Sequence, residues 1–158
     1  MKHISRGTLL TLLMFVMSGC NTQDTGPSGP SGGQVTFKID GLLNDNGIVW
    51  LVLFNEPDAF PVQSERAIAR GHARIKNKSA EIVISNIPHG TYAAAVMHDE
   101  NEDGSLPFAE DGTPLKAVGH SNNPPRGRQP TFAEAAFTLD EGKEVVDIAM
   151  VYYMKRPA

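Results

Sequence analysis

An acidic stretch, residues 98–110, has the residue types and the spacing of a calcium-binding loop. The pattern D-x-[DN]-x-[DN]-G-x5-E is matched at all its specified positions by Asp99, Asn101, Asp103, Gly104 and Glu110. A hard cation takes about six to eight oxygen ligands, and a tightly coiled loop presents every second side chain to its centre. The stretch therefore predicts one Ca²⁺ site.

Each predicted ligand has a role in that site. The side chains of Asp99, Asn101 and Asp103 supply oxygens, Ser105 supplies its backbone carbonyl, and Glu110 closes the shell, a role that Asp111 could also take. No helix is expected on either side, so the stretch is not an EF-hand pair. The alternative is a metal-free acidic turn in which Asp and Asn side chains accept hydrogen bonds from nearby amides and a glycine takes positive φ.

Two histidines lie in the same long segment, which runs from residue 98 to about residue 130 without regular periodicity. Segments of this length without secondary structure are usually functional or disordered, so we expect a binding surface for an envelope protein or glycan, formed by His98, His120, Ser121, Asn122 and Asn123. A Ser/His/Asp hydrolase is the third hypothesis. It lacks a G-x-S-x-G-like elbow for the nucleophile, and two histidines are too few for a zinc site. The sequence predicts that the protein is not an enzyme.

The first 20 residues have the organisation of a secretion signal. They combine a basic start with an apolar run, residues 9–17, that is shorter than the roughly 20 residues needed to span a bilayer. The ending Met17-Ser18-Gly19-Cys20 resembles a bacterial lipobox, whose cysteine is lipidated and becomes the new N-terminus. Cys20 is the only cysteine and has no disulfide partner. The alternative is an ordinary signal peptide with a cysteine near its end by chance.

We therefore expect a signal peptide at residues 1–19, a lipidated Cys20 with a Gly/Pro/Ser tether to residue 33, a domain at residues 34–153 and a short tail. Asn21 after the cysteine resembles lipoproteins sorted to the outer membrane, facing the periplasm or the cell surface. Removal of the signal leaves 12 basic and 18 acidic residues. No basic patch interleaved with aromatic residues is present, which argues against nucleic-acid binding.

The domain has the period-two apolar pattern of strands with one buried face. Seven strands are predicted, over residues 35–39, 48–54, 70–76, 80–84, 92–97, 132–139 and 145–153. We expect Asn77-Lys78 to close a hairpin between the third and fourth strands. We also expect the connection at residues 55–68 to cross between sheets, with one helical turn at residues 64–69. The run 48–54 is apolar on both faces and carries the single tryptophan, Trp50, as a central strand does. Short strands separated by turn signals predict an all-β antiparallel sandwich of immunoglobulin or transthyretin type.

An ordered string of motifs resembles the DUF2141 family of exported bacterial proteins, which has no assigned activity. The string covers residues 35–153 and comprises Gly90-Thr-Tyr-Ala, His98-Asp-Glu-Asn, Asp103-Gly, Gly112-Thr-Pro, Gly119-His-Ser-Asn-Asn, Pro130-Thr-Phe, Glu134-Ala-Ala-Phe and residues 148–152. The resemblance implies a β-sandwich with residues 98–103 and 119–123 as its characteristic surface. The chain departs from the family pattern at Ser105-Leu-Pro-Phe and at His120.

Overall fold

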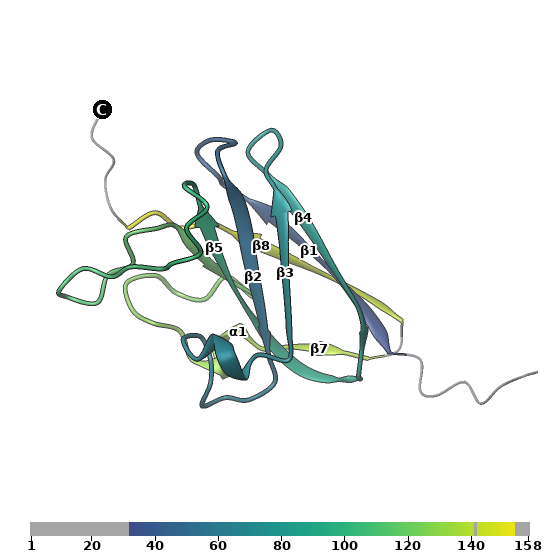
Figure 1. Cartoon of the computed structure of the whole chain (residues 1–158). Helices are drawn as coiled ribbons and strands as arrows, with labels where there is room; N and C mark the ends of the chain where they lie inside the picture. Colours follow the sequence, from purple (N-terminus) through teal and green to yellow (C-terminus); the bar gives the residue numbers. More distant parts are fainter. Residues whose placement is uncertain (1–31, 141, 154–158) are drawn as a thin grey trace, which may run out of the picture.

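Two packed β-sheets make up the computed structural model, which describes residues 32–140 and 142–153 (Figure 1). One sheet has the order β4 (Ala80–Ile87), β1 (Gly33–Asp40), β8 (Lys143–Ala149). The other has the order β3 (Ala69–Arg74), β2 (Ile48–Phe54), β5 (Gly90–Asp99), β6 (Val118–His120), with β7 (Phe137–Leu139) pairing with the start of β5. The predicted all-β sandwich is confirmed.

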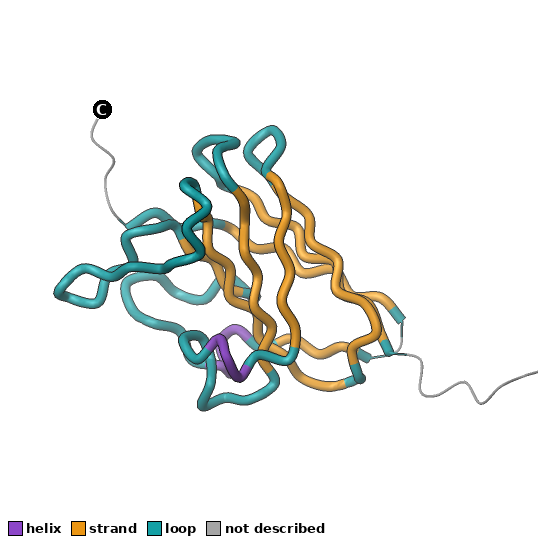
Figure 2. Tube along the Cα trace, in the orientation of Figure 1, coloured by secondary structure: helices purple, strands orange, loops and turns teal. Residues whose placement is uncertain are grey.

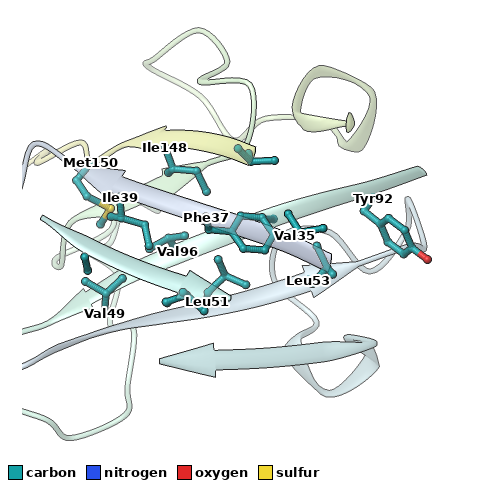
Figure 3. Close-up of a cluster of buried hydrophobic side chains, with 14 of the residues drawn as sticks. Val35, Phe37, Ile39, Val49, Leu51, Leu53, Tyr92, Val96, Ile148 and Met150 are labelled. Carbon is teal, nitrogen blue, oxygen red and sulfur yellow. The ribbon is translucent and has the colours of Figure 1, made fainter. Parts of the chain in front are cut away.

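The core lies between the sheets and is built from alternate residues of their strands (Figure 3). Val35, Phe37 and Ile39 of β1 are fully buried, as are Leu51 and Leu53 of β2. Since successive strand side chains point to opposite faces, the residues between them lie on the outer faces. The outer face of β2 and β5 is also apolar, and it carries the feature discussed below.

One strand pair departs from the antiparallel arrangement. β1 pairs with β8 in parallel, in a register that runs from Gln34 opposite Lys143 to Asp40 opposite Ala149. Hairpin partners must be antiparallel, whereas strands far apart in the sequence are free of that constraint. The period-two pattern of a strand says nothing about its direction.

The turn at Asn77-Lys78 was predicted to close a hairpin, and both residues do take positive φ, 54° and 60°. The strands that it joins, β3 and β4, lie in different sheets. The predicted sheet crossover at residues 55–68 is wrong, because β2 and β3 pair with each other over Ile48–Arg74 to Leu53–Ala69. The expected single helical turn in that connection is present as η1 (Ser64–Arg66).

The predicted strand 132–139 is only in part a strand. Its first half is a short helix, α1 (Phe132–Ala135), which Thr131 caps reciprocally with Glu134. This helix and the η1 connection cover one end of the outer face of the five-stranded sheet with a second apolar cluster, Phe54, Ala59, Phe60, Ala93 and Ala135. Figure 2 shows the long loops gathered on this side. Across the described residues, the structure has no helix of the length and apolarity that a bilayer crossing needs.

Candidate functional site

The acidic turn, residues 99–105, begins where β5 ends and is held by its own side chains. Asp99 is fully buried, and its Oδ2 accepts a hydrogen bond from the Gly104 N–H at 2.7 Å. Asp103 Oδ1 accepts from both the N–H and the hydroxyl of Ser105, each at 2.8 Å, and Asp103 Oδ2 accepts from Asn101 Nδ2 at 2.7 Å. Four of the five predicted metal ligands are therefore in one turn.

A lysine ammonium lies between the two aspartates. Lys116 Nζ is 2.6 Å from Asp99 Oδ1 and 2.5 Å from Asp103 Oδ1, and only 14% of the Lys116 side chain is exposed. Burial works to raise the pKa of Asp99, but the hydrogen bonds from Lys116 and Gly104 outweigh it and hold the pKa below its usual range. The hydrogen bonds from Lys116 and Ser105 also lower the pKa of Asp103. The chain thus supplies its own cation to these carboxylates.

Glu110 is at a different place. It is exposed at the tip of a small hairpin closed by the hydrogen bonds Ala109 N to Thr113 O at 2.8 Å and Leu115 N to Pro107 O at 2.9 Å. Over residues 32–140 and 142–153, no three His, Cys, Asp or Glu side chains are close enough together to hold a metal ion. Glu110 is therefore not brought to Asp99 and Asp103, because residues 107–115 pair with themselves instead of folding back.

His98 is an interior residue. It is 1% exposed; Nε2 lies 2.8 Å from the Asn46 carbonyl and Nδ1 lies 2.8 Å from the Tyr152 hydroxyl. A carbonyl only accepts, so Nε2 carries a proton and donates to Asn46. The same hydroxyl accepts from the Leu43 N–H at 3.1 Å. His98 thus joins β5 to the β1–β2 loop and to the end of the described chain.

The side chains of residues 121–123 form hydrogen bonds to the backbone of other elements. The buried Ser121 hydroxyl accepts from the Ala94 N–H at 2.8 Å and donates to the Ala135 carbonyl at 2.5 Å. Asn123 extends the edge of β8, with Oδ1 accepting from the Ala149 N–H at 2.7 Å and Nδ2 donating to the Asp147 carbonyl at 3.0 Å. Asn122 donates to the Ala136 carbonyl.

No serine–histidine pair forms among these residues. Ser121 Oγ is engaged by backbone groups, and His98 by Asn46 and Tyr152. His120 packs edge-on against Phe60, with ring centroids 5.7 Å apart, and burial lowers its pKa to about 4. The nucleophile and base that a hydrolase needs within hydrogen-bond reach are not assembled here.

A groove on the outer face of the five-stranded sheet is a feature that the sequence did not predict. Its volume is about 930 Å³, within the range of about 300–1,000 Å³ typical of small-molecule sites. The floor is formed by outward residues of two central strands, Trp50 and Val52 of β2 and Ala95 and Met97 of β5. The walls come from three loops and the end of the described chain, and include Pro61, Val62, Leu106, Phe108, Pro114, Pro130 and Tyr153.

Apolar side chains on the walls stay exposed. Val62 is 59% exposed, Phe108 49% and Tyr153 37%, and their grouping around one groove sets them apart from scattered surface apolar residues. On the floor, the Trp50 indole lies 5.0 Å from the His72 ring, and its Nε1 is shielded from solvent without an acceptor among the described residues. A donor in that state is uncommon in native proteins.

Of the residues predicted for a binding surface, only His120 lines the groove. The acidic turn contacts it through Gly104, so this turn fixes the wall that carries Leu106 and Phe108. One signal for the groove was present in the sequence. A central strand that is apolar on both faces needs a cover on each face, and residues 55–68 and 100–130 were the only long connections able to provide one.

Comparisons with known proteins identify the family and little else. None of the curated proteins matches the chain. A solved structure of a pilus-presented adhesin, Spy0125 (Cpa), is similar over 78% of this chain and 27% of its own length, with 11% identity and a TM-score of 0.29; the chain thus spans about a quarter of that adhesin. The family model described as an uncharacterized protein conserved in bacteria matches residues 37–147. The chain belongs to this family, DUF2141.

Proposed function

We propose that this protein is a ligand-binding module of the bacterial cell envelope and that its ligand occupies the outer-face groove. The observation that carries the proposal is the uncovered apolar floor around Trp50 and Met97, walled by exposed apolar side chains. A large apolar groove with few polar groups is the feature that most often marks a binding site. The site is thus the groove, rather than the whole surface of residues 98–123.

The acidic turn serves this function by holding the wall in place. Asp99 is buried at the end of β5, and Lys116 lies two residues before β6, so the ion pair joins the two ends of the loop 100–117. A wall that is ordered before binding costs the ligand less conformational entropy. We therefore assign Asp99, Asp103 and Lys116 to preorganisation of the groove.

The proposal places the module on a lipid anchor. Cys20 lies outside the described residues, and the lipid anchor is proposed from the lipobox-like ending of the signal segment. Strand β1 begins opposite Ile87, at the end of the sandwich opposite Asp99 (Figure 1). A tether to a membrane that enters at Gly33 would leave the acidic turn, which follows Asp99, at the end of the sandwich away from the lipid surface.

Calcium binding at the acidic turn is a separate proposal. Asp99, Asn101, Asp103 and Ser105 would supply oxygens, and Glu110 would have to move from the tip of the neighbouring hairpin to join them. The Lys116 ammonium bonds both aspartates, so an ion would have to displace it. At 100 times its dissociation constant, calcium should stabilise the protein by about 2.7 kcal/mol relative to chelator. Changing both aspartates to Ala should abolish that rise in melting temperature; a rise that survives the change would place the ion elsewhere.

The binding proposal is tested by photo-cross-linking in intact cells. A photoreactive amino acid replaces Phe108 on the groove wall, and the control replaces Val83 on the outer face of β4; the native residues are 49% and 47% exposed. A discrete, light-dependent increase in mass at position 108, absent at position 83, is the expected result. Equal labelling at both positions, or none at position 108, would contradict a ligand in the groove.

A further inference from the structure

The side chains that line the groove indicate which chemical class of ligand fits it, an inference that rests on the proposed function. A bound peptide usually adds to a strand edge, where free backbone N–H and C=O groups receive it. The floor strands β2 and β5 have no such edge, because each is paired on both sides. Their outward side chains at the floor, Trp50, Val52, Ala95 and Met97, offer no acceptor and only a shielded indole N–H as donor. An alkyl chain fits this floor better than a peptide or a glycan, both of which need hydrogen bonds along their length.

Apart from the Tyr153 phenol, four ionisable side chains from different elements line the groove: Arg70, Arg128, His120 and Asp111. Arg128 is paired with Glu134, which leaves no net charge there. Burial lowers the pKa of His120 to about 4, so its ring is neutral at pH 7. The Asp111 carboxylate accepts from the Thr113 N–H at 2.9 Å, on the hairpin beyond β5.

Arg70 is different from these groups. It lies on β3, the strand next to β2 at the other side of the floor, and its guanidinium donates to the Ser64 carbonyl. Among the described residues, no carboxylate forms an ion pair with it. A guanidinium with free N–H groups beside an apolar floor binds carboxylate or phosphate oxygens strongly.

We propose that the ligand is a single-chain anionic amphiphile, with its alkyl chain on Trp50, Val52 and Met97 and its head group on Arg70. Charge complementarity selects the anion, and the pairing of Arg128 leaves Arg70 as its partner. Asp111, at the far side of the floor, disfavours the reversed orientation. Arg70 is the specificity-determining residue of the site.

Trp50 allows a direct test because it is the only tryptophan in the chain and lies on the floor. The purified protein is titrated with decanoate, 1-decanol and decylammonium below their aggregation concentrations while Trp50 fluorescence is recorded. We expect saturable binding with decanoate about tenfold tighter than decanol, which corresponds to one charge-assisted pair, and decylammonium weakest. Arg70→Gln should remove the preference for decanoate and leave decanol binding unchanged.

Arg74→Gln is the matched control, since Arg74 is on the same face of β3 but pairs with Glu102 outside the groove. This variant should keep the preference. Equal affinity for decanoate and decanol, or the same loss in both variants, would overturn the anionic ligand while leaving the groove as a binding site. No saturable response to any probe would overturn the amphiphile itself, and cross-linking at position 108 then decides the proposed function independently. Binding only to anionic phospholipid vesicles, and not to decanoate, would show a membrane surface in place of a free amphiphile.

Discussion

Replacing Lys116 with Met removes the ammonium that two carboxylates share while keeping an alkyl chain of similar length. Asp99 then remains fully buried with one hydrogen bond, from the Gly104 N–H. Removing one partner of a fully buried ion pair costs about 3–5 kcal/mol, whereas exposed pairs contribute about 0–1 kcal/mol. The Lys116 side chain is 14% exposed and that of Asp99 is 0%, so this pair falls nearer the buried case. We expect a loss of about 2–3 kcal/mol.

In a domain of this size that loss lowers the melting temperature by about 10 °C. The measurement is denaturant unfolding followed by circular dichroism at pH 7, with Lys38→Met, an exposed change on β1, as control. The folded pKa values of Asp99 and Asp103 lie below their ordinary value of 3.8. The stability from this pairing is therefore present above pH 3.8 and is lost as the pH falls through the folded pKa. The difference between wild type and Lys116→Met should shrink in that acidic range.

A Lys116→Met protein as stable as the Lys38→Met control would refute the assignment of Lys116 as the cation that orders the acidic turn. The same variant also bears on calcium. If the turn accepts the ion, removal of the competing ammonium should make the calcium-induced rise in melting temperature larger than in wild type. An equal or smaller rise would contradict competition between Lys116 and calcium.

Three further changes test the frame of the site. Gly47→Ala should destabilise the protein far more than Gly104→Ala. Both glycines have positive φ, but a Cβ at position 47 would lie 2.0 Å from the Asp99 carbonyl oxygen, whereas one at position 104 meets nothing within 4 Å. Equal denaturation midpoints for the two variants would contradict this. Ser121→Ala leaves a buried backbone N–H without its acceptor and should cost about 1–3 kcal/mol by urea unfolding. A change below about 0.5 kcal/mol, the size of an ordinary surface substitution, would indicate a replacement acceptor. Burial lowers the pKa of His120 from 6.5 to about 4, so the unfolded chain binds a proton at this residue before the folded chain does. The free energy of unfolding should therefore fall by about 3 kcal/mol as the pH drops from 6.5 to 4. The stability–pH profile of His120→Gln should be flatter, and an unchanged slope would show that His120 is not the cause of the pH dependence.

The sequence predicted those features that depend on neighbouring residues. A run that is apolar on both faces located the central strand with Trp50, and Asn77-Lys78 located a tight turn, because both signals are local. The parallel pairing of β1 with β8 and the assignment of β3 and β4 to different sheets depend on contacts between distant segments. Strand periodicity carries no information about such partners.

The acidic turn shows the same division. The template placed Asp99, Asn101, Asp103 and Ser105 in one turn, but it could not show that Lys116, 13 residues beyond Asp103, would place its ammonium between the carboxylates. His98 and Ser121 were predicted to lie on a binding surface, because histidine and serine occur both in functional sites and in structural hydrogen bonds. Only their burial and their backbone partners distinguish the two uses.

The parallel pairing of β1 and β8 has a consequence for when the protein can fold. β1 is the middle strand of its sheet, and one of its two neighbours is the last strand of the domain, with Gln34 opposite Lys143. Contacts of such sequence separation slow folding, since a long loop must close before they form. During synthesis or export, one edge of β1 therefore stays unpaired until residues 143–149 have emerged. A chain that is cut before β8 cannot complete this sheet.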